Sequence, residues 1–297
     1  MNLHIKSGWI RATIFFFIVV VAFFLSQISA KILFNFFFTE HGVLLRLLIS
    51  QIVTLVFILI IIYFFRKFID RKSIVSLGFS IKNRVKDIIF ALVLGFIIMA
   101  SGFSLLLIFG NLEIIALNFV PYVMFISLIT LLAVSLIEEI VFRGYLLNNL
   151  MESINKYFAL VIISVIFGVL HSLNANFTIV GLINLTLFGI LIGIPYIFNQ
   201  NLWFPISFHL SWNYSQGPIF GFFVSGKGEG IKFLTTQDLQ GNPLITGGDF
   251  GFEGSLILTI ILLISILILK YFYKNNKHIR TLKHRGIAVS ADRDQKS

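Results

Sequence analysis

Five ionisable side chains of this sequence lie deep inside long apolar stretches, where a charged group is costly. They are two glutamates, one arginine and two histidines: Glu138, Glu139, Arg143, His171 and His209. A charged side chain at the middle of a membrane-spanning helix costs about 2.5–3.5 kcal/mol on the insertion scale. Such residues persist where they pair with one another or line a polar cavity, so they are the first candidates for catalysis.

The first group reads Glu-Glu-Ile-Val-Phe-Arg and predicts one ion pair and one free carboxylate. Glu139 and Arg143 are at i and i+4, so on a helix they share a face and can pair. Glu138 points about 100° away and has no partner on its own helix. A carboxylate without a partner in such a site is a candidate general base. The alternative is an ion pair that only holds helices together, which explains Glu139 and Arg143 but not Glu138.

The other two groups place imidazoles and an amide on later apolar stretches. His171 closes a Phe-x-x-x-His run, whereas His209 and Asn213 are again at i and i+4 and can face the same side. A lone histidine on an apolar helix is more often a packing residue than a catalyst. Two histidines, an amide and a free glutamate together make that interpretation weaker. Three helices that each carry a polar face are predicted to share one cavity.

The three motifs together are specific. Glu-Glu-x-x-x-Arg, Phe-x-x-x-His and His-x-x-x-Asn, in this order on successive hydrophobic helices, resemble the CPBP family of intramembrane proteases. This family is also called the type II CAAX prenyl endopeptidase or Abi family. The resemblance covers roughly residues 121–272, and no motif position is substituted. It implies an intramembrane endopeptidase that hydrolyses a peptide bond with activated water.

The resemblance also implies a role for each motif residue. Glu138 resembles the glutamate that activates water, and His171 resembles the histidine that helps it. His209 and Asn213 resemble the pair that stabilises the oxyanion. Glu139 and Arg143 resemble the supporting residues that fix the position of Glu138.

The implied partners are a peptide or membrane-protein substrate and the lipid bilayer. Bacterial members of the family are linked to peptide maturation, bacteriocin immunity and surface-protein display. Richness in Ile, Phe, Asn and Lys is typical of an AT-rich bacterial genome. The expected role is therefore bacterial peptide or membrane-protein processing, or immunity, rather than cleavage of a prenylated protein.

Three alternatives remain open. Glu138, His171 and His209 match the ligand count of a hydrolytic zinc site. The sequence has no His-Glu-x-x-His motif, and Asn213 beside His209 suits an oxyanion hole, so a mechanism without a required cofactor is favoured over zinc. A non-catalytic membrane scaffold or immunity protein would need the fold but not the glutamate with both histidines. A transporter or channel with a proton relay would use similar residues, but no inverted repeat is visible.

The elements that position these residues are predicted to be transmembrane helices. Hydrophobic residues make up 58% of the 297 and charged residues only 12%, against about 25% charged residues in a soluble domain. The expected fold is all-α, a polytopic membrane bundle of about eight transmembrane helices. The apolar blocks are 14–25 with a weaker extension to 38, 47–65, 88–109, 119–137, 158–170, 179–198, 202–223 and 255–272.

Two of these helices must extend beyond their apolar blocks. Block 158–170 is too short to span unless its helix runs on past His171. Glu138 and His171 can meet only if the helix of block 119–137 also continues, to about Leu150. The sequence therefore predicts both continuations.

The basic residues predict topology rather than nucleic-acid binding. The net charge of +10 is concentrated in residues 66–86 and 270–297, each with a net charge of +6, whereas residues 217–254 carry −2. Because basic residues flank spans on the cytoplasmic side, both termini are expected in the cytoplasm of a plasma membrane, with residues 217–254 outside. Nucleic acid is not an expected partner. The first helix is expected to be retained rather than cleaved as a signal peptide, because apolarity resumes directly after Ala30.

One domain is expected. Residues 1–297 form a single membrane domain, residues 118–273 its protease-like catalytic region, and residues 274–297 a basic, disordered cytoplasmic tail. The sequence contains no cysteine, which excludes disulfides and thiol catalysis.

Overall fold

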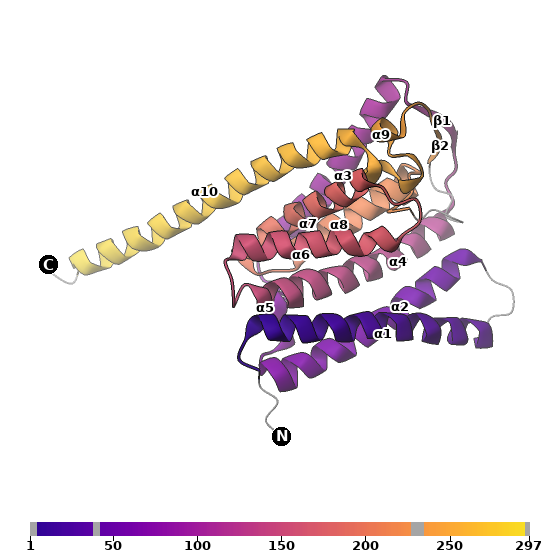
Figure 1. Ribbon diagram of the computed structural model, residues 1–297. Coiled ribbons are helices and arrows are strands. Elements are labelled where there is room, and N and C mark those ends of the chain that lie inside the picture. Colours follow the sequence, from indigo (N-terminus) through magenta and orange to yellow (C-terminus); the bar gives the residue numbers. More distant parts are fainter. Residues whose placement is uncertain (1–4, 38–41, 227–234, 295–297) are drawn as a thin grey trace.

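The computed structural model describes residues 5–37, 42–226 and 235–294, and side chains up to residue 275 except those of 235–237. Within these ranges most regular structure is helical (Figure 1). The elements that build the bundle are α1 (Gly8–Phe37), α2 (Val43–Phe64), η1 (Phe65–Asp70), α3 (Val85–Ile108), α4 (Pro121–Glu139), η3 (Ile140–Leu147), α5 (Asn148–Leu150), α6 (Lys156–Leu170), η4 (His171–Leu173), α7 (Ile179–Asn199), α8 (Trp203–Tyr214), η5 (Ser215–Ile219) and α10 (Leu256–Asp294).

Seven helical segments of the described chain are long and apolar enough to cross a membrane. An all-α, polytopic membrane bundle is thus confirmed. The eighth expected segment, 202–223, forms a shorter element, because α8 has 12 residues and the π-helical turn η5 adds five. The segments of spanning length are Gly8–Phe37, Val43–Asp70, Val85–Ile108, Pro121–Leu150, Lys156–Leu173, Ile179–Asn199 and Leu256–Asn275.

Helix α8 is short, and hydrogen bonds attach both of its ends to other segments. At its start the Leu202 N–H donates to the Gly78 carbonyl at 3.0 Å, and at its end the Tyr214 hydroxyl donates to the Met124 carbonyl at 3.3 Å. Most of its side chains are buried, and α8 packs against α3, α4 and α7. Contacts with three other helices therefore hold α8 in place.

The two ends of the bundle differ in charge. The basic end contains residues 66–86 and α5, whereas the loop end contains α9 (Pro243–Thr246) and the strands β1 (Leu112–Leu117) and β2 (Thr235–Leu239) (Figure 1). The start of α1 and the far end of α10 both lie toward the basic end. Which end faces the cytoplasm stays a prediction. Disorder of residues 274–297 also stays a prediction, and the side chains beyond residue 275 lie outside the described residues.

Two helices continue beyond their apolar blocks, as the motifs require. α4 passes without a break into the π-helix η3 and then into α5, which ends at Leu150. α6 passes into the 3-10 turn η4, which begins at His171. Both predicted continuations are confirmed. The π-helix begins directly after the two glutamates, and such segments occur frequently at functional sites.

A buried ionic cluster fixes α1 and η1 to η3 at the basic end. Arg66 donates to Asp70 at 2.8 Å, and the Arg11 Nε lies 3.6 Å from the same carboxylate. The Tyr145 hydroxyl of η3 also donates to Asp70, at 3.0 Å. The sequence places Asp70 in a basic loop, yet it is 3% exposed. Two hydrogen-bond donors, Arg66 and Tyr145, and the nearby charge of Arg11 compensate for the removal of this carboxylate from water.

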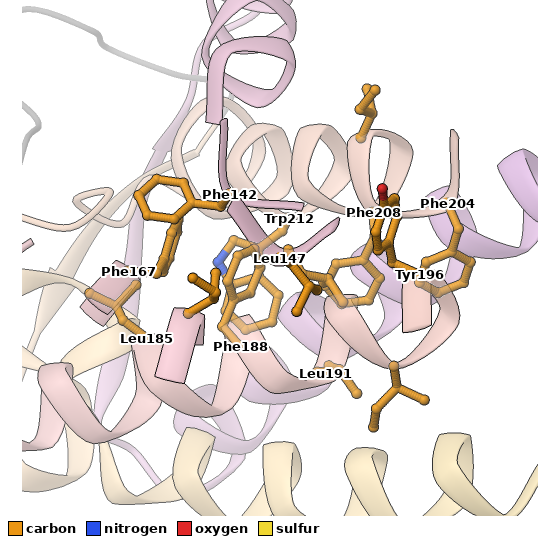
Figure 2. Close-up of a cluster of buried hydrophobic side chains, with 14 of the residues drawn as sticks. Phe142, Leu147, Phe167, Leu185, Phe188, Leu191, Tyr196, Phe204, Phe208 and Trp212 are labelled. Carbon is orange, nitrogen blue, oxygen red and sulfur yellow. The ribbon is translucent and has the colours of Figure 1, made fainter. Parts of the chain in front are cut away.

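The core around the three motifs is aromatic and joins four elements (Figure 2). Phe167 of α6 lies against Phe142 of η3 and against Phe188 of α7, with ring centroids 5.1 and 5.8 Å apart. Phe188 in turn contacts Trp212 of α8 at 4.9 Å. Such pairs contribute about 0.5–1.5 kcal/mol each beyond their buried area. The core therefore holds the segments that carry the motifs at fixed positions.

The loop end contains a small sheet that the sequence did not predict. β1 pairs antiparallel with β2, with Leu112 opposite Leu239 and an irregularity between Ile114 and Ala116. The sheet ties the α3–α4 connection to the long segment between α8 and α10.

Candidate active site

A cavity of about 550 Å³, here called the central cavity, lies among the motif helices. Its lining includes four of the residues singled out by sequence: Glu138, His171, His209 and Asn213. They come from α4, η4 and α8. The predicted sharing of one cavity by the three polar helix faces is thus confirmed.

Glu139 forms the ion pair predicted from the spacing. The Arg143 guanidinium donates to Glu139 Oε1 at 2.9 Å, and both side chains are fully removed from solvent. A second arginine nitrogen donates to the Gly189 carbonyl of α7 at 3.3 Å. Gly189 also lets α6 lie close to α7, because a Cβ there would be 2.9 Å from Ser164 Cβ. Arg143 thus joins α7 to the glutamate motif.

Glu139 also binds His209, a contact that the sequence did not predict. His209 Nδ1 lies 2.8 Å from Glu139 Oε1, the same oxygen that accepts from Arg143. Because a carboxylate only accepts hydrogen bonds, Nδ1 of His209 carries a proton. Glu139 therefore orients the imidazole of α8 in addition to holding the arginine. The support of Glu138 that the resemblance implies for Glu139 and Arg143 stays a prediction.

Glu138 faces the central cavity rather than an ion-pair partner on its own helix. Its side chain is 25% exposed, and its Oε2 lies 3.8 Å from His209 Nε2, too far for a hydrogen bond. Within the described residues Oε2 has no hydrogen-bond partner. The two neighbouring glutamates thus differ. Glu139 is fully buried and paired, whereas Glu138 faces the central cavity.

His171 has one ring nitrogen fixed by the backbone. Its Nδ1 lies 2.8 Å from the Phe167 carbonyl, an acceptor, so Nδ1 carries a proton. In the neutral ring Nε2 is then an acceptor. The Phe167 ring packs against both histidines, with centroid distances of 4.5 Å to His171 and 6.3 Å to His209. The two imidazoles thus share one phenyl ring as a neighbour.

Asn213 lies one helical turn after His209 and lines the same cavity. It is 5% exposed, and no hydrogen bond of its amide to another described residue is found. Its N–H group is therefore available to a ligand in the cavity.

Glu253 also lines the central cavity, although the sequence did not indicate it as a site residue. Its carboxylate accepts from Trp212 Nε1 at 3.1 Å and from the Ser225 N–H and hydroxyl at 2.7 and 2.6 Å. These bonds, with one from Gly226 N–H to the Phe250 carbonyl at 2.9 Å, fix a roof segment, residues 223–226, at the cavity. The sequence around Glu253 is typical of a loop. Its position directly before the last apolar block is the only sequence signal of burial.

No group of three or more histidines and carboxylates in the described parts of the chain is arranged to hold a metal ion. The candidate zinc ligands Glu138, His171 and His209 share the cavity without forming such a group.

The fold and the site define a multi-pass membrane protein with a cavity of carboxylate, imidazole and amide groups. Comparison with protein families makes this class specific, since residues 119–215 match the model of the Rce1-like, type II CAAX prenyl endopeptidases. The match confirms the resemblance carried by the three motifs, since this segment is similar to a family of endopeptidases. The matched segment is less than half of the chain but contains all three motifs. No curated protein and no solved structure matches the chain significantly.

Proposed function

We propose that this protein is an intramembrane endopeptidase in which Glu138 activates a water molecule. The observation that supports this most is the presence of Glu138, His171, His209 and Asn213 around one cavity. Glu138 takes a proton from water, and the resulting hydroxide attacks the carbonyl carbon of the scissile peptide bond. When the tetrahedral intermediate collapses, Glu138 returns the proton to the leaving amine. The products are a carboxylic acid and an amine, and the glutamate is regenerated.

His171 assists by accepting a hydrogen bond from the attacking water. Its Nδ1 proton is committed to the Phe167 carbonyl, which leaves Nε2 of the neutral ring as an acceptor. The water is thereby held between a carboxylate and an imidazole, so that a lone pair of its oxygen can point at the carbonyl carbon.

His209 and Asn213 stabilise the oxyanion that forms on the carbonyl oxygen. The Asn213 amide is a donor at any pH. Because Nδ1 of His209 is held by Glu139, Nε2 is the ring nitrogen that lies toward Glu138, and it donates to the oxyanion when it carries a proton. Removing one donor from an oxyanion site typically costs about 100- to 1,000-fold in rate. In this proposal Glu139 and Arg143 are positioning residues.

We further propose that the reaction requires no metal ion. His209 and His171 then act through hydrogen bonds, and a chelator finds no metal ion to remove. We expect cleavage by purified protein to be unchanged after incubation with 1,10-phenanthroline and dialysis, measured with a quenched fluorescent peptide. Loss of activity that added Zn²⁺ restores would contradict this and favour Glu138, His171 and His209 as ligands.

The proposed biological role is processing of peptides or membrane proteins, or bacteriocin immunity, in a bacterial plasma membrane, with both termini in the cytoplasm. It rests on the basic end, on the composition and on the family match.

A comparison of cells tests the activity and identifies the substrate in the same experiment. Membrane and secreted proteomes are compared between cells with the wild-type chain and cells with Glu138→Ala at equal abundance. We expect at least one full-length precursor to accumulate in the variant cells. The N-terminus that cleavage of this precursor creates in wild-type cells should be missing from them. Identical sets of protein termini would instead support a non-catalytic scaffold.

A further inference from the structure

One wall of the central cavity takes no part in the proposed chemistry. Along α4 the lining residues Ser127, Thr130, Leu131 and Val134 lead to Glu138. Their spacing of mostly three or four residues places them on one face of the helix. The stripe begins near the loop end of the bundle, where α4 starts, and ends at the proposed general base.

Helix α2 supplies the facing wall. Its lining residues are three apolar side chains and one amide: Val43, Leu44, Leu47 and Gln51. The neighbouring Ser50 turns the other way and donates to Gln27 of α1 at 2.7 Å. Within the described chain no hydrogen bond is found for the Gln51 side chain. The wall is thus apolar, with one amide available to a ligand.

Ser127 is the second polar group without a partner. It is 2% exposed, and its Oγ forms no hydrogen bond with any described residue. Two other hydroxyls of α4 behave differently, since Thr130 and Ser135 donate to the carbonyls of Ile126 and Leu131 at 2.8 and 2.9 Å. A buried hydroxyl left unpaired destabilises a protein. A ligand group that binds this one is therefore favoured.

The length of the stripe fits a short stretch of polypeptide. Ser127 precedes Glu138 by eleven residues, which is about 16 Å along a helix axis. An extended peptide covers this distance with about five residues, at roughly 3.3 Å per residue. Its backbone carries donors and acceptors for a hydroxyl and an amide, and its side chains meet apolar walls.

We propose that the α2–α4 wall is the subsite that binds about five residues of the substrate in extended form, adjacent to the scissile bond. Its occupant is an apolar peptide segment whose backbone bonds to the Ser127 hydroxyl and the Gln51 amide. This subsite deepens the proposed protease function and rests on it.

The lack of cysteine allows a direct measurement of peptide conformation in the subsite. The double variant Ser127→Cys/Val134→Cys, in a Glu138→Gln chain, has two thiols about 10 Å apart along α4. The probes are alanine–leucine decapeptides with two cysteines activated as 2-thiopyridyl disulfides, separated by one to eight positions. Doubly linked one-to-one adducts are counted by mass spectrometry. This measurement does not depend on the register of the peptide along α4, because only the separation of its two cysteines matters.

Side chains of an extended peptide alternate between two faces, so only cysteines at an even separation can both meet α4. We expect the yield of double adducts to be greatest at separations of two or four positions, which bracket the distance of about 10 Å, and at least tenfold above a control with Leu128→Cys in place of Ser127→Cys. Leu128 is 39% exposed and lies outside the cavity lining. A yield equal to that control, or a maximum near seven positions as for a helical peptide, would overturn the subsite. If adducts peak at two or four positions but cleavage does not depend on Glu138, the groove stands and the protease mechanism fails. If cleavage depends on Glu138 but no adduct forms, only the subsite fails.

Discussion

Replacing Glu138 by Gln is expected to abolish peptide cleavage while the protein still inserts and accumulates. Glutamine keeps the size of the side chain but cannot take the proton from water. General acid–base catalysis contributes about 100- to 10,000-fold, and here one residue serves in both proton transfers, so a loss of at least about 1,000-fold is expected. Because Glu138 lies at the cavity without an ion-pair partner on its own helix, its neutralisation leaves no buried cation uncompensated. The measurements are kcat/KM on a quenched fluorescent peptide and a melting curve in detergent.

Glu113→Gln is a matched control for this experiment. Glu113 lies on β1, away from the central cavity, and its carboxylate accepts from Gln240 at 3.3 Å. We expect both activity and thermal stability of that variant to equal those of the wild-type chain. Full activity of Glu138→Gln would end the protease proposal and leave the scaffold as the better account.

Replacing Glu139 by Gln is expected to damage stability and activity together. The change leaves the Arg143 guanidinium, which is 1% exposed, without its counter-charge. Breaking a buried ion pair in this way costs about 3–5 kcal/mol. His209 also loses the carboxylate at Nδ1 that fixes its ring. Abundance, melting temperature and kcat should therefore all fall.

The double variant Glu139→Gln/Arg143→Met separates the two effects. Removing the arginine along with its partner eliminates the uncompensated charge, so the melting temperature should recover in large part. Activity should stay low, because His209 still lacks its carboxylate. Recovery of both would show that Glu139 acts only through the ion pair and would contradict its role in orienting the histidine.

The spacing of residues within one helix predicted the contacts that one helix can determine. Glu139 and Arg143 are paired because i and i+4 positions share a face, and the same rule placed Asn213 beside His209. The all-α membrane fold followed from the apolar blocks, which also required the helix to extend past His171. These features depend on local geometry and on the cost of charge in lipid.

The features that sequence did not predict depend on contacts between distant segments. The bond of His209 to Glu139 joins residues 70 positions apart, and that of Trp212 to Glu253 joins residues 41 positions apart. The π-helix after Glu139 has no residue signature such as proline or glycine at its start. Glu253 stands in a glycine-rich segment that resembles a solvent-exposed loop, so its burial depends on the position of α8 and the roof segment. The burial of α8 against α3, α4 and α7 is likewise a contact between distant segments.

The roof of the cavity also determines when during synthesis the site becomes complete. The residues of all three motifs are made before Glu253, the carboxylate that anchors residues 223–226 and that lies just before α10. Because chains emerge from the ribosome N-terminus first, the cavity has its polar side chains before it has its roof. A chain that stops before residue 253 therefore contains every motif and still lacks the carboxylate that holds the roof over the central cavity.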